Sequence, residues 1–285
     1  MQWQGRRGSS NVEDRRGQGG MSPRGCSVGG GIGTIVIILI YWLMGGNPLQ
    51  LIGQLSGDGQ GDTSGYTQEY AHTAESDSTA RFVSVVLADT EDVWTNIFNQ
   101  MGRDYRKPTL VIFSGYTTSA CGTAQSATGP FYCSEDEKIY IDLAFFNQMA
   151  GQLQAGGDFA YAYVIAHEVG HHVQKLLGTL DQVHDMMART DDVNANKLSV
   201  ALELQADFYA GVWANHTQSM FNSLDQGDIE EALNAANAIG DDKLQESSQG
   251  YSVPDSFTHG TSKQRHDWFY KGYKTGDIKQ GNTFE

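Results

Sequence analysis

The stretch DFAYAYVIAHEVGHHVQKLLG, residues 158–178, carries histidines and a glutamate inside an otherwise apolar run. His167 and His171 are four residues apart, so in a helix both imidazoles lie on one face and can bind the same metal ion. Glu168 directly follows the first histidine. This is the HExxH pattern, which predicts zinc bound by the histidines and a glutamate that removes a proton from water during peptide-bond hydrolysis.

The alternative is a buried structural helix whose histidines form local hydrogen bonds. A helix that is apolar on nearly every side is buried, and buried polar side chains need partners. One metal ion would serve His167, Glu168 and His171 together, so we favour the metal site. His172 lies about 140° around the helix from His167, and we expect it to support the site or the core, for example by a hydrogen bond to Glu168.

A catalytic zinc site needs a third protein ligand. The chain has Gln174 and Leu177 where the HExxHxxGxxH pattern requires glycine and histidine, which excludes that class. The later segment ELQAD offers Glu203 and Asp207 on one face of a helix. Two carboxylates at this spacing repel each other. The conflict disappears if Glu203 binds zinc and Asp207 accepts the free ring N–H of a ligand histidine; the alternative is a half-exposed acidic stripe.

The elements that position these residues can be predicted from the spacing of apolar residues. Short apolar runs predict strands within 107–115 and at 138–142, and helical periodicity predicts helices at 78–102, 158–177, 196–216, 227–240 and 261–276. We therefore expect an α+β domain that is mostly helical, with a small sheet ahead of the HExxH helix. We expect the strand at 138–142 to be an edge strand above the zinc, able to pair with an extended peptide; an ordinary core strand is the alternative.

Charge divides the chain into a basic beginning and an acidic remainder. The 285 residues contain 19 Lys and Arg against 34 Asp and Glu, a net charge of −15 that argues against nucleic-acid binding. The first 24 residues nevertheless hold five arginines and only two acids. This asymmetry suggests that the two parts lie in different compartments.

The apolar stretch Val28 to Met44 separates them, and no charged residue occurs between Arg24 and Asp58. It is apolar on every side, which predicts a retained transmembrane helix; a cleaved signal peptide or a buried core helix are the alternatives. Arginines before the span place the N-terminus in the cytoplasm. We thus expect a single-pass inner-membrane protein with a periplasmic catalytic domain.

The expected domain organisation follows from these boundaries. It comprises a cytoplasmic basic N-terminus at 1–27, a membrane anchor at 28–44, a flexible linker rich in Gly, Ser, Asp and Gln at 45–78, and the peptidase domain at 79–285. Cys121 and Cys133 are the cysteines of the body, and in an oxidising compartment they should form a disulfide. Two buried thiols are the alternative.

HExxH with a downstream ExxAD resembles the gluzincin class of metallopeptidases. More narrowly, the chain resembles a family of membrane-anchored bacterial neutral zinc metallopeptidases. The matching segments are WQGRRGSSNVEDRRG, CGTAQSATGPFYC, GDFAYAYVIAHEVGHHVQKLLG, ELQAD, GDIEEALNAANAIGDDKLQ and VPDSFTHGTSKQR. The resemblance implies a zincin-like fold, a zinc cofactor and peptide hydrolysis.

The segment FTHGTSKQR also looks like a stretch that follows ExxAD in some membrane-linked gluzincins. By that similarity His259 would face the oxyanion of the transition state, and Arg265 would orient the loop or the substrate. The alternative is a helix cap, in which Thr261 or Ser262 opens a helix and His259 packs before it.

Two functions remain as hypotheses. The first is a membrane-anchored zinc peptidase that acts on peptide or protein substrates through a water activated by zinc and Glu168. The second is a membrane-anchored zinc-binding scaffold that does not cleave. A scaffold needs metal ligands but no general base, so the presence of Glu168 favours the peptidase.

Overall fold

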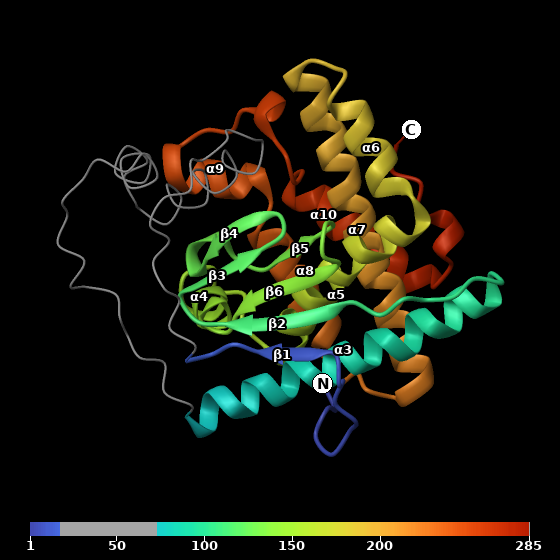
Figure 1. Cartoon of the computed structure of the whole chain (residues 1–285). Helices are drawn as coiled ribbons and strands as arrows, with labels where there is room; N and C mark the ends of the chain where they lie inside the picture. The colour runs from blue at the N-terminus through green and yellow to red at the C-terminus, as the bar shows by residue number, and fades with distance from the viewer. Residues whose placement is uncertain (18–72, 285) are drawn as a thin grey trace.

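A computed structural model describes residues 1–17 and 73–284 (Figure 1). The predicted membrane anchor at 28–44 and most of the predicted linker lie outside these described residues. Within the described ranges, none of the helices combines the length and the apolar character needed to cross a bilayer.

The described residues form an α+β fold in which helices predominate, as predicted. The strands are β1 Val12–Asp14, β2 Thr109–Phe113, β3 Tyr116–Ser119, β4 Gly122–Gln125, β5 Phe131–Cys133 and β6 Lys138–Asp142. The helices are α3 Ala74–Gln100, α4 Ala144–Gly151, α5 Asp158–Leu177, α6 Thr179–Met187, α7 Asp192–Phe221, α8 Asp228–Ala238, α9 Asp241–Gln249 and α10 Ser262–Thr275. Short 3₁₀ turns occur at η1 Ser126–Thr128, η2 Pro254–Ser256 and η3 Ile278–Gln280.

The main sheet has the strand order β1-β2-β6-β5, and β3 and β4 form a separate hairpin (Figure 1). The pairs β1-β2 and β2-β6 are parallel, whereas β5 runs antiparallel to β6. The edge-strand prediction for residues 138–142 is therefore wrong, because β6 lies between β2 and β5. The physical reason is that β6 is apolar on both faces, as suits an internal strand: Ile139 and Ile141 pack in the main core, and Tyr140 packs on the opposite face.

The helix α5 crosses close to α7, and this contact brings the two halves of the predicted metal site together. At the contact lies Gly170, where an added Cβ would come within 2.9 Å of the carbonyl oxygen of Ala206. Helix α10 also packs closely on α7, since a Cβ on Gly211 would lie 2.0 Å from the carbonyl oxygen of Phe269. These contacts position α10 beside the α5–α7 pair.

The N-terminal segment belongs to the same folded unit as the rest of the described chain. Strand β1 extends the sheet, with Glu13 in register with Val111. The predicted domain boundaries are wrong here, because the domain contains residues 1–17 and its first long helix begins at Ala74, capped by Thr73 rather than Ser78. Since β1 and β2 are hydrogen-bonded neighbours, they lie on the same side of any membrane, and a cytoplasmic N-terminus opposite a periplasmic domain does not fit this arrangement.

The basic residues of this segment have partners within the domain. Arg6 lies 2.6 Å from Asp89, and Arg7 lies 2.8 Å from Asp92. The buried Glu91 accepts hydrogen bonds from the side chains of Ser9 and Asn11. Arg6, Arg7 and Arg16 thus each pair with an acidic group of α3, and Arg15 pairs with Glu13. Arg24 lies outside the described residues.

Candidate metal centre

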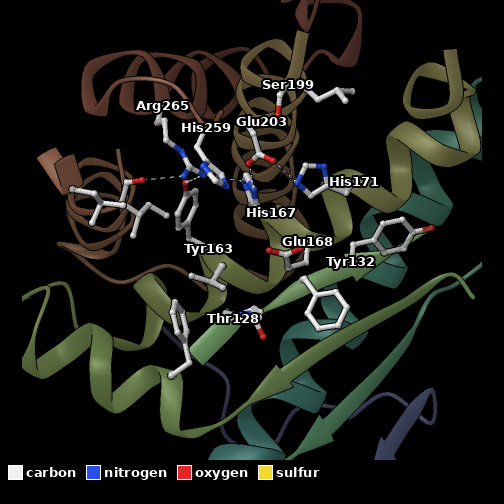
Figure 2. A pocket seen from close by; sticks show the side chains of 18 of the residues that line it. Thr128, Tyr132, Tyr163, His167, Glu168, His171, Ser199, Glu203, His259 and Arg265 are labelled. Carbon is white, nitrogen blue, oxygen red and sulfur yellow. Dashed lines mark hydrogen bonds and ion pairs between the residues drawn. The ribbon is translucent and has the colours of Figure 1, made fainter. Parts of the chain in front are cut away.

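His167 and His171 on α5 converge with Glu203 on α7 (Figure 2). One ligand atom from each of the three side chains lies within 4.8 Å of the others. The Nε2 atoms of His167 and His171 lie 3.1 and 3.5 Å from the carboxylate oxygens of Glu203. The prediction that these three residues are neighbours is confirmed, because α5 and α7 present them to the same point between the two helices.

The charges around these donors suit a cation. Burial by itself raises the pKa of Glu203, but the facing imidazoles of His171 and His167 lower it well below its usual value. Burial lowers the pKa of His167, yet Asp207 and Glu203 outweigh that effect and raise it to about 10. The carboxylates of Asp207 and Glu203 therefore favour a positive charge at this place, and a bound metal ion would supply that charge in place of the ring proton. Two imidazoles and one carboxylate are also a donor set typical of catalytic zinc, so the residues present fit this metal.

Asp207 lies directly behind the first histidine, as predicted. Its Oδ1 atom is 2.8 Å from Nδ1 of His167, so the carboxylate accepts the ring N–H that faces away from the metal position. Tyr163 also donates its hydroxyl to the same oxygen. Asp207 is fully buried, which by itself raises its pKa, but Arg265 and His167 lower that pKa to about 2. Asp207 is thus an ionised group that holds His167 in one tautomer and orientation.

Arg265 comes from α10 and pairs with Asp207. Its Nε and Nη2 atoms lie 2.8 and 3.1 Å from the two carboxylate oxygens, and the side chain is buried. Arg265 thereby holds Asp207, which in turn orients His167. Arg265 also contacts the loop between α8 and α9, where its Nη1 atom lies 3.5 Å from the carbonyl oxygen of Ile239. An orienting contact with the substrate stays a prediction.

Glu168 lines the cavity in front of the three candidate ligands. Burial raises the pKa of its carboxyl above the usual value, and the nearby histidines reduce this shift. In Figure 2 its carboxylate lies below Glu203, between His167 and Tyr132. This position and the raised pKa suit a group that takes up and releases a proton.

Gln174 fixes the second histidine and was not predicted. Its Oε1 atom lies 2.9 Å from Nδ1 of His171, while its Nε2 atom donates to the carbonyl of Leu202. The spacing of three residues from His171 on the buried face of the helix was the available signal. Gln174 therefore plays for His171 the part that Asp207 plays for His167.

His172 faces away from the metal position and does not bond to Glu168, so that prediction is wrong. Its Nε2 atom donates to the carbonyl of Arg106 at 2.6 Å, and Nδ1 accepts from the hydroxyl of Tyr132 at 3.0 Å. Burial lowers the pKa of His172 to about 4, which keeps the ring neutral. Because Tyr132 belongs to the edge strand β5, His172 connects the HExxH helix to that strand.

His259 lines the same cavity from the segment before α10 (Figure 2). Its Nδ1 atom lies 3.3 Å from Asp241, whose other oxygen accepts the backbone N–H of His259 at 2.6 Å. Burial lowers the pKa of His259, but Asp241 and Glu203 outweigh this and raise it. Thr261 caps α10, as the alternative predicted, and the role of His259 toward the oxyanion stays a prediction. Asp241 was not predicted.

The cavity has a volume of about 560 Å³ and is bordered by β5, α4, α5, α6, α7 and the chain around α9.

The predicted disulfide is present: Cys121 and Cys133 are bonded, with their Cα atoms 5.8 Å apart. Cys133 ends the edge strand β5, and Cys121 lines the cavity. The disulfide therefore connects the end of the edge strand to the neighbouring hairpin.

Relatives of this chain occur in distant bacteria. The chain is 48% identical over 287 residues to "Uncharacterized protein YpfJ" of Escherichia coli K12, covering 100% of this chain and 99% of that protein. It is 39% identical over 214 residues to proteins Rv2575 of Mycobacterium tuberculosis and Mb2605 of Mycobacterium bovis, covering 72% of this chain and 71% of each relative. No solved structure matches the chain.

A family model described as "Putative neutral zinc metallopeptidase" matches residues 1–284. The match includes the N-terminal segment that pairs with the sheet as well as the helices that carry His167, His171 and Glu203. The chain belongs to this family of neutral zinc metallopeptidases.

Proposed function

We propose that this protein is a zinc-dependent peptidase that cleaves peptide or protein substrates. The observation that carries the proposal is the convergence of His167, His171 and Glu203 on one point of a cavity that Glu168 also lines. The family to which the chain belongs supports the same activity. Zinc held by these three residues would lower the pKa of a water molecule to about 7 and polarise the carbonyl group of the substrate.

The residues of the chain divide the remaining work among them. Glu168 accepts the proton of the attacking water and returns it to the leaving amine, a transfer favoured by its raised pKa. His259, whose pKa is raised by Asp241 and Glu203, donates a hydrogen bond to the oxygen on which negative charge develops. Phe131 and Tyr132 of the edge strand β5 line the cavity, where an extended peptide would pair with this strand.

We further propose that the domain works in an oxidising compartment. The Cys121–Cys133 disulfide supports this, because such bonds persist outside the cytosol. Attachment to the inner membrane through the apolar stretch at 28–44 stays a separate proposal, and it requires that this stretch enter the bilayer without carrying residues 1–17 to the opposite side. Alkylation of free thiols in intact cells, followed by mass spectrometry, tests the compartment: Cys121 and Cys133 should resist alkylation unless a reductant is added.

The test of the peptidase function compares the full-length wild-type protein with Glu168→Gln and Glu203→Gln. Wild type should bind about one zinc per chain and hydrolyse casein, and a chelator should abolish hydrolysis until zinc is restored. Glu168→Gln should keep the zinc and lose hydrolysis, whereas Glu203→Gln should lose both. Zinc-loaded wild type without hydrolysis would contradict the proposal and leave a zinc-binding scaffold as the function.

A further inference from the structure

We propose that the cavity selects substrates with a large apolar side chain next to the scissile bond, and that a pocket at α6 receives this side chain. The inference rests on the proposed peptidase function and adds the class of substrate to it. The α6 pocket is formed by Tyr132, Leu180, Met187 and Leu202, all of which line the cavity. It opens into the same cavity as the metal position, because the candidate ligands His167, His171 and Glu203 line that cavity too.

The four residues form a continuous apolar surface. Leu180 and Leu202 belong to one buried cluster, against which the partly buried Tyr132 and Met187 pack. They come from β5, α6 and α7, so the pocket is built by tertiary structure and not by a single loop. Tyr132 is held by its hydrogen bond to His172, which makes one wall of the pocket rigid.

The carboxylates and the guanidinium that line the cavity are already engaged at the metal centre. Among the described residues that line it, the acidic and basic side chains other than histidine are Glu168, Glu203 and Arg265. Glu203 faces the two histidines, Arg265 is paired with Asp207, and Glu168 is the proposed base. The four side chains that form the α6 pocket are themselves uncharged, so a charged substrate side chain would lose its water there without gaining an ion pair. An apolar side chain gains roughly 10- to 100-fold in affinity from burial.

Met187 offers a sharp test because its neighbour Met186 is an internal control. Met187 lines the cavity, whereas Met186 is 48% exposed and does not line it. Met187→Glu and Met186→Glu thus place the same charge at adjacent positions of α6, and only the first should change the pocket. Met187→Ala is a milder second variant that enlarges the pocket without adding charge.

The experiment measures peptide binding by fluorescence anisotropy in the zinc-loaded, full-length Glu168→Gln background, where no cleavage is expected. The probes are labelled Gly/Ser octapeptides with a single central Leu, Phe, Ala, Lys or Asp. Leu and Phe peptides should bind at least about 10-fold more tightly than the others. Met187→Glu should remove this preference and strengthen binding of the Lys peptide. Met187→Ala should bind the Phe peptide more tightly than the Leu peptide. Met186→Glu should show the same affinities as the Glu168→Gln background.

Two results would overturn the inference: similar affinities for the Leu, Lys and Asp peptides, or the same binding profile for Met187→Glu and Met186→Glu. The proposed peptidase function fails in a different way. If zinc-loaded wild type leaves every tightly bound peptide intact, the function is wrong while the apolar selectivity of the α6 pocket stands.

Discussion

Arg265 and Asp207 form a buried, two-pronged ion pair behind the candidate ligand His167, with nitrogen–oxygen distances of 2.8 and 3.1 Å. The pair links α10 to α7, and Asp207 links it onward to α5 through His167. The orientation of the first histidine thus depends on a helix that begins 95 residues after it. The site is held by packing of the whole helical layer and not by the HExxH helix alone.

Asp207→Asn should weaken zinc binding about 10- to 100-fold, because the amide cannot act as the same anionic acceptor for the N–H of His167. Zinc affinity is measured by competition with a chromogenic chelator. Asp185→Asn, at an exposed position of α6, is the control and should leave the affinity unchanged. Equal zinc affinity for Asp207→Asn and wild type would show that Asp207 does not position the ligand.

His259→Phe should lower kcat about 10²- to 10³-fold while zinc content stays the same, since the hydrogen bond to the developing negative charge is lost. The measurement is steady-state hydrolysis of a quenched fluorescent peptide. His266→Phe is the matched control, because His266 lies on α10 but does not line the cavity. An undiminished kcat for folded, zinc-loaded His259→Phe would exclude the oxyanion role.

Tyr132→Phe should raise KM about 3- to 10-fold with little change in zinc content. The ring remains in the α6 pocket, but the hydrogen bond that holds β5 to His172 is removed, which is worth roughly 1 kcal/mol. Tyr116→Phe, which removes an exposed hydroxyl contact on β3, should have no effect. A lower kcat at constant KM would instead indicate that Tyr132 acts on the reacting atoms.

The stability of the domain should depend on pH through Asp89. Burial raises the pKa of Asp89 from 3.8 to about 7, although Arg6 counteracts this shift. At a pH between 3.8 and about 7, Asp89 keeps its proton in the folded protein but releases it in the unfolded chain. Stability is therefore lost as pH rises through this range.

Urea unfolding of wild type and Asp89→Asn at pH 5 and pH 8 measures this contribution. The free energy of unfolding of wild type should fall relative to Asp89→Asn by about 3 kcal/mol between pH 5 and pH 8, because about two of these pH units lie below the folded pKa. Arg6→Met should enlarge the fall because it leaves the buried carboxylate without its partner. A difference between wild type and Asp89→Asn that does not change with pH would refute the raised pKa.

Local spacing was sufficient to predict each half of the metal centre. His167 and His171 on one helix, and Glu203 and Asp207 on another, are four residues apart, and helix periodicity places each pair on one face. The α+β composition and the disulfide could also be predicted, since apolar periodicity and cysteine pairing are properties of short segments or of residue type. These features require no knowledge of how distant segments pack.

Distant packing decided the rest. FYC and KIYID are both short apolar runs, and only the sheet order makes β5 the edge strand and β6 an internal one. His172 could have turned toward Glu168, but its partner is Tyr132 of β5. The arginines near the N-terminus suggested a separate compartment, yet Arg6 pairs with Asp89 across 83 residues of sequence. Composition reports the charge of a segment, whereas the partner that neutralises it is set by tertiary contacts, because a buried carboxylate is stable only where the fold supplies a cation.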